Sequence, residues 1–362
     1  MSTGLGIKGI LGAAKQTLEQ TAVAATDKVL FSSEDLHKET AFIDHEYLYG
    51  GAGKRDSQKV FEPVVGPIET PFPYTEKGSG GDFIGSDLLL AAAMGTVTWN
   101  AGETNNEVTF QDDLDAFLTL AVAKGVNTGA GSTWECTCGF MNQFTIAGNS
   151  GENLALSFET SALAQIITGS TNTAASLIAL DDDIPSLANF SDVTFKIADQ
   201  VDALHATTDN QAISSFTLTV NNNLTEPQQA TPGDLNYGGG QVHSNPLIPI
   251  KPVRNGFREV TLELTLPRYE DDTFLDWRDN ETKLQAEFTI TDGTNSIWIY
   301  IPNCKVLTAS EPVAGAEAIG QTISIKAFVY NDHGFMFFQD GTTDNAGELW
   351  MEFSNERTAA IF

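Results

Sequence analysis

Apolar residues recur at every second position in several segments of this 362-residue sequence, and this period constrains the fold more than any other feature. Successive side chains of a β-strand point to opposite faces, so the alternation marks strands that bury one face. The segments with this pattern are residues 154–160, 216–224, 258–267 and 322–329. The chain is therefore predicted to be mainly β.

The order of the predicted elements repeats along the chain. The elements of the first half are a strand at 59–65 that ends at Gly66-Pro67, a helix at 86–95 and a strand at 154–160. Those of the second half are a strand at 260–266, a short helix at 272–277, a hairpin across Asp292-Gly293 and a strand at 322–329. Asp-Gly is a strong hairpin signal, and glycine and proline punctuate elements. We predict two tandem β-sandwich or β-barrel domains, each with a short flanking α-helix.

The predicted domain boundaries follow shifts in composition. The segments are an N-terminal arm at 1–26, a first domain at 27–180, a second domain at 181–334 and a C-terminal hairpin or extension at 335–362. The terminal hairpin would join the apolar runs 335–338 and 349–353, which suit either a core or a clasp between subunits. Residues 112–124 fit a strand or a helix, and the glycine-containing turn at 127–131 favours a strand.

The charge balance limits the classes of partner. The chain has 48 acidic and 19 basic residues, a net charge of −29. A DNA-binding surface needs Lys or Arg to displace counterions, so a basic nucleic-acid site is not expected. The acidity serves solubility, or it suits a surface that lies near nucleic acid without holding it. No apolar run is long enough for a transmembrane helix, and the glycine-broken start reads as a short amphipathic arm.

No residue pattern indicates catalysis, a metal or a cofactor. The loop 50–54 lacks the glycine and the hydroxyl residue of a phosphate-binding loop. The acidic runs 181–183 and 270–272 do not follow a calcium-loop pattern, and the second fits the N-terminus of a helix. Cys136 and Cys138 would share one face of a strand, and with Cys304 they are expected to be reduced thiols. We expect no enzymatic activity.

The order of these elements resembles a bacteriophage major tail tube protein, of the long-tailed, non-contractile kind. The resemblance rests on residues 59–66, the small-residue helix at 88–94, the strand at 216–224 and the segment 254–266, and it spans about residues 27–330. It implies β-sandwich domains whose sheets join into a continuous inner barrel. It also implies rings of six such domains that stack into the tube through which DNA leaves the capsid. With two domains in each chain, three chains would complete a ring; a hexamer of one larger domain is the alternative.

The resemblance also implies partners. They are other copies of the chain, the tape measure, tail terminator and distal tail proteins, and DNA that passes without specific binding, in a tail assembled in the host cytoplasm. The loops 1–12, 50–54 and 227–252 are expected between rings. The candidate contacts between rings or subunits are Lys54, Arg55, Tyr237, Phe337 and Trp350.

Two other classes of protein remain open from the sequence. A carbohydrate-binding or adhesin-like β-sandwich would use Trp99, Trp134 or Trp298 as a sugar platform. Another virion component, such as a capsid decoration or a tail terminator, would share the strands but stop short of a tube.

Overall fold

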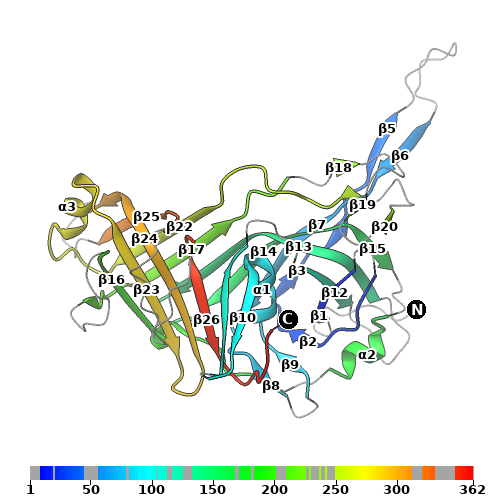
Figure 1. Cartoon of the computed structure of the whole chain (residues 1–362), viewed down its shortest axis with the longest axis horizontal. Coiled ribbons are helices and arrows are strands. Elements are labelled where there is room, and N and C mark those ends of the chain that lie inside the picture. Colours follow the sequence, from blue (N-terminus) through cyan, green and yellow to red (C-terminus); the bar gives the residue numbers. More distant parts are fainter. Residues whose placement is uncertain are drawn as a thin grey trace.

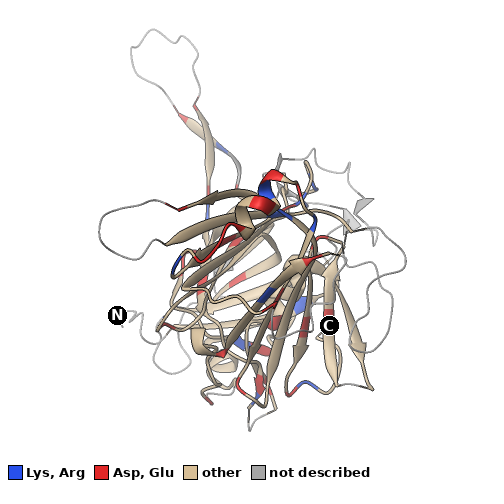
Figure 2. Cartoon of the chain, turned by 90° about the vertical axis from the view of Figure 1, so that its left-hand side faces the viewer, with Lys and Arg blue, Asp and Glu red and all other residues tan. Residues whose placement is uncertain are grey.

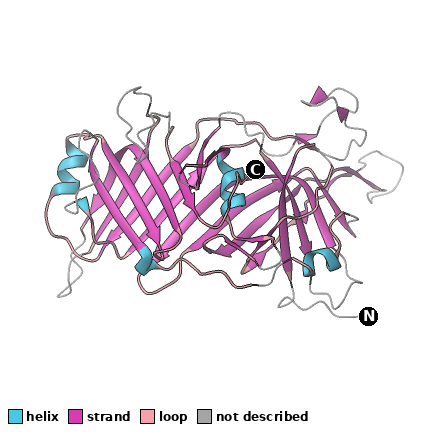
Figure 3. Ribbon diagram, turned by 60° about the horizontal axis from the view of Figure 1, so that its bottom comes forward, coloured by secondary structure: helices cyan, strands magenta, loops and turns pink. Residues whose placement is uncertain are grey.

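The structure is a computed structural model and describes residues 9–18, 21–44, 56–78, 81–102, 104–111, 116–124, 133–167, 171–180, 183–200, 209–225, 228–229, 236–237, 241–242, 249–311, 320–330 and 347–361. The described residues are mainly β, as predicted, and strands run through the length of the molecule (Figures 1 and 3). The helices are α1 (Asp87–Met94), α2 (Ala174–Ile178), α3 (Thr273–Asp279) and the 3-10 turn η2 (Phe190–Asp192).

The strands up to α2 are β1 (Ile10–Gln16), β2 (Asp27–Val29), β3 (Ser33–Glu34), β4 (His37–Lys38), β5 (Ala41–Asp44), β6 (Ser57–Phe61), β7 (Val64–Pro71), β8 (Glu76–Lys77), β9 (Phe83–Ile84), β10 (Gly95–Asn100), β11 (Asn105–Phe110), β12 (Phe117–Ala123), β13 (Thr133–Asn149), β14 (Ala155–Ala162) and β15 (Ala164–Ile167). The later strands are β16 (Val193–Asp199), β17 (Ser215–Asn221), β18 (Gln228–Gln229), β19 (Asn236–Tyr237), β20 (Gln241–Val242), β21 (Pro249–Ile250), β22 (Glu259–Leu266), β23 (Leu284–Thr291), β24 (Ser296–Ser310), β25 (Gln321–Ala327) and β26 (Trp350–Ser354).

Two sets of strands pair in the same order. The first set runs β1–β12–β13–β14–β7 and ends with β3 and β4, which together form one segment, β3–β4. The second set runs β16–β23–β24–β25–β22–β17. In sequence α1 lies between β7 and β12, and α3 lies between β22 and β23. Each set therefore places a helix at the same point of the same pairing order.

The register of the pairing also matches between the sets. The pairing of β13 with β12 extends to Gly139, and the pairing of β24 with β23 extends to Cys304. A β-bulge follows Met141 where β13 pairs with β14, and another follows Val306 where β24 pairs with β25. The same shift of 165 positions relates both features, from 139 to 304 and from 141 to 306. A bulge bends a strand and increases its twist, so both long strands change direction at equivalent points.

The two sets join through β13 and β17. The first part of β13 lies between β12 and β15, and its second part lies between β14 and β17. The result is one continuous sheet in the order β24–β25–β22–β17–β13–β14–β7–β3–β4, which we call the long sheet. β26 makes a second connection, because it pairs with β24 on one side and with β11 on the other.

One apolar core lies under both sets. It includes Phe144 and Phe158 of the first set, Leu262 and Phe288 of the second set, and the apolar residues of α1. The alternation that predicted the strands is visible in burial, since β14, β22 and β25 alternate buried and more exposed residues. The predicted strands at 154–160, 216–224, 258–267 and 322–329 are confirmed.

Several other predictions from local sequence are confirmed. Residues 117–123 of the ambiguous segment form a strand, β12. The two predicted helices are α1 and α3, although the Ser86 side chain makes no capping hydrogen bond. β23 and β24 form the predicted hairpin, and Gly293 adopts φ +91° in its turn. Glycine reaches this left-handed region without the steric cost of a Cβ atom.

Other predictions are wrong. The strand predicted at 59–65 is divided between β6 and β7, and β7 continues through Gly66-Pro67 to Pro71. Pro67 fits because its carbonyl still accepts a hydrogen bond from the Asp35 N–H (3.1 Å), and Gly66 supplies φ +153°. Residues 133–149 form one long strand, β13, which the sequence analysis did not predict.

The two neighbouring cysteines do not share a face. Cys138 has φ +56° at the bulge between β12 and β13, which breaks the alternation. Cys136 therefore packs in the main core, whereas Cys138 packs with Phe117 and Phe140. Burial raises the pKa of the Cys136 thiol to about 12, and all three cysteines are buried thiols outside any disulfide.

The ends of the described chain differ from what the sequence suggested. Residues 10–16, placed in an arm, form β1, which pairs with both β12 and β2. The run at 349–353 contributes to β26, and both edges of β26 are taken by β11 and β24. Its expected hairpin partner, 335–338, lies outside the described residues. The polar segment at 170–185 contains the short helix α2, which the sequence did not predict.

Candidate functional site

One face of the long sheet is polar across both sets of strands. A single row of directly opposed residues crosses the sheet in the order Lys305, Lys326, Thr261, Thr219, Thr145, Ser157, Glu69 and Ser33. Neighbouring rows on this face add Glu159, Glu259 and Glu263. Lys326 forms an ion pair with Glu259 (3.1 Å). Figure 2 shows that the strands of the molecule are mostly uncharged, with scattered acidic and basic positions.

The junction between the sets is a seven-residue antiparallel pairing of β13 with β17. It runs from Gln143 opposite Asn221 to Asn149 opposite Ser215. On the polar face the hydroxyls of Thr145 and Thr219 lie 3.4 Å apart. On the core face Gly148 lies opposite Phe216, whose ring stacks at 4.7 Å on Phe288. The junction therefore combines backbone pairing with apolar packing.

Helix α1 lies at this junction and is entirely buried. Each of its eight residues is at most 2% exposed. Its sequence is apolar all round except for Asp87, which is typical of a helix covered on every side. The Asn222 side chain donates hydrogen bonds to the carbonyls of Ala93 (2.8 Å) and Met141 (3.1 Å), which ties β17 to both α1 and β13.

A buried ionic cluster fixes the start of α1. Arg357 binds both carboxylate oxygens of Asp87, with Nε–Oδ2 at 2.7 Å and Nη2–Oδ1 at 2.9 Å. Its guanidinium also binds Asp27 of β2 and lies over the Phe83 ring at 4.1 Å. Asn355 donates to Asp87 at 3.1 Å. The cluster joins three segments that are far apart in the sequence.

The two carboxylates of this cluster shift in opposite directions. Burial raises the pKa of Asp27 above its ordinary value, and the attraction of Arg357 offsets only part of this effect. Burial also acts on Asp87, but the charge and hydrogen bonds of Arg357 outweigh it and lower the pKa. Asp87 is therefore the principal counter-ion of Arg357, because it receives the paired hydrogen bonds.

A second buried arginine holds the other end of the junction. Arg258 forms an ion pair with Glu348 (2.8 Å) and donates to the Gln111 carbonyl (3.0 Å). Its guanidinium lies over the Phe110 ring at 3.8 Å, and its Nε donates to Asn222 at 3.4 Å. Both arginine clusters thus connect the C-terminal residues to the junction.

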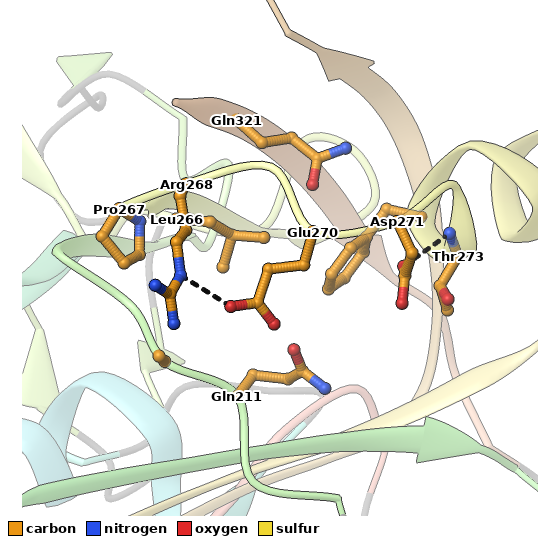
Figure 4. Close-up of a pocket in the computed structure, with 10 residues that line it drawn as sticks. Gln211, Leu266, Pro267, Arg268, Glu270, Asp271, Thr273 and Gln321 are labelled. Atoms are coloured by element: carbon orange, nitrogen blue, oxygen red, sulfur yellow. Dashed lines mark hydrogen bonds and ion pairs between the residues drawn. The ribbon is translucent and has the colours of Figure 1, made fainter. Parts of the chain in front are cut away.

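A pocket beside α3 has a structural explanation. Figure 4 shows Glu270 between Gln211 and Gln321, with the Arg268–Glu270 ion pair at 2.7 Å. Asp271 accepts a hydrogen bond from the Thr273 N–H (3.0 Å), and hydrogen bonds from the side chain and the backbone of Thr273 lower the pKa of Asp271. An acidic side chain that binds an N–H group at the start of a helix stabilises that helix, so Asp271 has a structural role at α3.

The residues predicted as contacts are not brought together in the described structure. Lys54, Arg55 and Phe337 lie outside the described residues, and Tyr237 lies on the short strand β19. Trp350 is 3% exposed and packs with Trp298, Tyr300 and Tyr330, which leaves it little surface for a second subunit. Their roles as contacts stay a prediction.

The strands beside the 50–54 loop form a projecting hairpin. β5 and β6 pair with each other and extend away from the body of the molecule (Figure 1). Phe42 and Ile43 of β5 are each 60% exposed. Exposed apolar residues on a two-stranded hairpin indicate an interaction surface, because such a hairpin is only marginally stable alone.

Sequence reasoning missed the groups that hold the junction. Arg357 and Asp27 lie 330 positions apart, and Arg258 and Glu348 lie 90 positions apart. A lone arginine in a polar segment carries no local signal of its partner. The acidic residue that opens α1 was the one available hint, because Asp87 sits in a helix that is otherwise apolar.

Comparison with known families identifies the class of protein. A family model described as phage tail tube protein matches residues 6–327, and the chain belongs to this family. The resemblance noted in the sequence is confirmed, and the protein is a structural component of the virion tail. Curated protein sequences gave no match. Among the described residues, no helix has the length and apolar character needed to cross a membrane.

Proposed function

We propose that copies of this chain assemble into closed rings, and that the rings stack into the tube through which the phage genome leaves the capsid. The observation that carries the proposal is the long sheet, which has one polar face, one apolar face buried under helices and strands, and two ends whose strand edges have no partner strand among the described residues. An open sheet edge invites pairing with another chain, and closure into a ring satisfies it.

The ring is proposed to contain three chains. The pairing order, the position of the helices and the 165-residue shift of the bulges support two tandem tube domains, with boundaries near 27–180 and 181–334. Six domains in a ring then require three chains. Six complete chains per ring is the competing arrangement.

The polar face of the long sheet is proposed to line the lumen. Threonine, serine and glutamate dominate its central rows, and at one end Lys305 and Lys326 form ion pairs with Glu281 and Glu259. A wall without rows of free Lys or Arg does not hold phosphates through counterion release, so DNA would pass without specific binding. Electron cryomicroscopy of assembled tubes tests this point: Thr145 and Glu263 should face the lumen, and an outward orientation would overturn it.

Contacts between rings are proposed at the β5–β6 hairpin. Phe42 and Ile43 are exposed there, close in sequence to the predicted contacts Lys54 and Arg55. Phe42→Ser with Ile43→Ser should leave rings intact and shorten or abolish tubes in electron micrographs. Ile184→Ser is the matched control, since Ile184 is 87% exposed elsewhere on the chain. Undiminished tubes in the hairpin variant would contradict this assignment.

Assembly itself is tested with the purified full chain. Mass photometry and negative-stain electron microscopy should show rings or tubes, and three chains in each ring. Rings of six complete chains would overturn the trimer, and a protein that stays monomeric under all assembly conditions would overturn the tube. The tape measure, tail terminator and distal tail proteins are the other proposed partners.

A further inference from the structure

We propose that the junction between neighbouring chains reproduces the β13–β17 junction within one chain. In this arrangement, β3–β4 of one chain adds to the open edge of β24 of the next chain. The inference rests on the proposed ring and deepens it, because it names the two edges and their register.

The equivalence of strands comes from the pairing registers. Thr160 pairs with Gly66 and Ile325 pairs with Leu262, so the 165-residue shift of β14 to β25 makes Gly66 and Leu262 equivalent. Extending this register to the next strand makes Ser33 equivalent to Ser215 and Lys38 equivalent to Val220, a constant shift of 182 (33 to 215, 38 to 220). The segment β3–β4 is therefore the first set's counterpart of β17.

Both edges that the proposal joins lack a strand partner among the described residues. β24 pairs with β23 only as far as Cys304 and with β26 only as far as Tyr300. Beyond these points β25 occupies one edge of β24 and the other edge is open. β3–β4 pairs with β7 alone. In the first set, β17 takes the position that is open in the second.

Exposure agrees with this difference. Thr308 and Ser310 of β24 are exposed, whereas the equivalent Gln143 and Thr145 of β13 are half-buried. His37 is exposed, whereas the equivalent Thr219 is half-buried. The same positions are covered where the junction exists and uncovered where it is missing.

The intrachain register predicts the interchain register residue by residue. Phe144 lies opposite Val220 and Thr145 lies opposite Thr219. Adding 165 to each β13 number gives the equivalent residue of β24, and subtracting 182 from each β17 number gives the equivalent residue of β3–β4. The two pairs then become Ala309 opposite Lys38 and Ser310 opposite His37 of the next chain.

The side chains at the proposed junction are complementary in charge. Glu311 would lie diagonally across from Lys38, within reach of a long side chain. The Glu311 Oε2 is buried and has no hydrogen-bond partner among the described residues, and Lys38 has a distant ion-pair partner in Glu62 (3.9 Å). The equivalent positions within the chain, Ile146 and Val220, are apolar. The junction between chains would be more polar than the one within a chain.

At each open edge, a side chain donates a hydrogen bond to a backbone carbonyl. The Arg278 guanidinium donates to the Ala309 carbonyl (3.4 Å), and the Gln165 amide donates to the Leu36 carbonyl (3.3 Å). Side chains that occupy edge carbonyls reduce unwanted strand pairing. Assembly would exchange these two long hydrogen bonds for backbone N–H donors of the neighbour.

A disulfide between the proposed partners tests the register. Directly opposed Cβ atoms on antiparallel strands lie about 4.5–5.5 Å apart, close enough for a disulfide after a small adjustment. His37→Cys with Ser310→Cys should give covalent dimers and trimers on a non-reducing gel after oxidation of assembled rings. Thr145→Cys with Thr219→Cys is the positive control, because that pair should cross-link within one chain. Ser33→Cys with Ser310→Cys is out of register by about 13 Å and should not cross-link.

The possible outcomes distinguish a failure of the proposed junction from a failure of the proposed ring. Rings that form without the 37–310 cross-link, while the 145–219 control cross-links, would overturn the junction and leave the proposed function standing. A failure of the wild-type protein to form any ring would overturn the proposed function and the junction with it.

Charge exchange gives a second test that does not depend on disulfide geometry. Lys38→Glu and Glu311→Lys should each lower the yield of rings by about fivefold, and the double variant should recover it. Circular dichroism of the unassembled chain controls for folding. Single variants without effect, or a double variant no better than either single one, would contradict the predicted contact.

Discussion

Helices α1 and α3 occupy equivalent places in the two sets of strands and differ in what covers them. Every residue of α1 is buried, whereas Phe274 alone is buried in α3. The sequences match these surroundings, because α1 is apolar apart from Asp87 and α3 carries Asp276, Arg278 and Asp279. α1 faces a junction that is permanent within the chain, and α3 faces the end of the molecule (Figure 1). The same pairing order can therefore include one junction that forms within the chain and one strand edge that has no partner among the described residues.

Removing the charge that anchors α1 should give the largest effect. Arg357→Ala leaves two buried carboxylates without their counter-ion, which costs about 3–5 kcal/mol. The matched change at α3, Arg278→Ala, removes an ion pair that is open to solvent and should cost far less. Urea denaturation of the unassembled protein measures both. Equal losses would show that the two helices are held alike and would break the comparison.

A cavity in α1 should cost almost as much. Leu89 is 0% exposed, and Leu89→Ala removes a buried side chain at a cost of about 2–5 kcal/mol. Leu275 of α3 is half-buried, so Leu275→Ala should cost less than half of that value. The free energies of unfolding from the same denaturation assay decide the order, and a larger loss at Leu275 would contradict it.

The glycine at the intrachain junction should tolerate no side chain. A Cβ atom on Gly148 would lie 2.7 Å from the Phe216 ring and 2.5 Å from a Leu154 methyl group. Gly148→Ala should therefore cost about 1–3 kcal/mol through overpacking. Ala147→Gly on the same strand is the control, because it changes the backbone freedom of β13 without adding a side chain. A neutral Gly148→Ala would mean that the junction can separate without loss.

The smallest expected effect is the pH dependence of the Arg357 cluster. The pKa of Asp87 is lowered, so its ionised form adds stability that is lost as pH falls below its ordinary value of 3.8. The pKa of Asp27 is raised, so its ionisation costs stability as pH rises through that raised value. Asp87→Asn should therefore be more harmful than Asp27→Asn at pH 7. Stability curves from pH 3 to 7 that show the reverse order would contradict the assignment.

Local patterns in the sequence were enough to predict much of the fold. Period-two alternation identified β14, β17, β22 and β25, and the Asp292-Gly293 turn identified the β23–β24 hairpin. The small-residue run identified α1 as a buried helix. These signals are local, because strand period and turn chemistry act over a few residues.

The features that the sequence did not predict depend on distant partners. The 17-residue length of β13 is set by four neighbouring strands, and β26 is placed between β11 and β24, which lie far apart in the chain. The buried pairs Arg357–Asp87 and Arg258–Glu348 have no periodic pattern. Which strand edges are open and which are paired depends on the registers of the two sets, and no local pattern in the sequence specifies those registers.

The position of Arg357 also affects the order of events during synthesis. Asp87 leaves the ribosome about 270 residues before Arg357 does, which at about 5–20 residues per second is roughly 14–54 s. During this interval the apolar helix α1 lacks the C-terminal residues that pack on its start, and Asp87 lacks its counter-ion Arg357. We expect nascent chains stalled before residue 350 to be cut by protease near α1, and chains stalled with residue 361 outside the ribosome to resist. The time for which α1 stays accessible to proteases and chaperones would then depend on when Arg357 is synthesised.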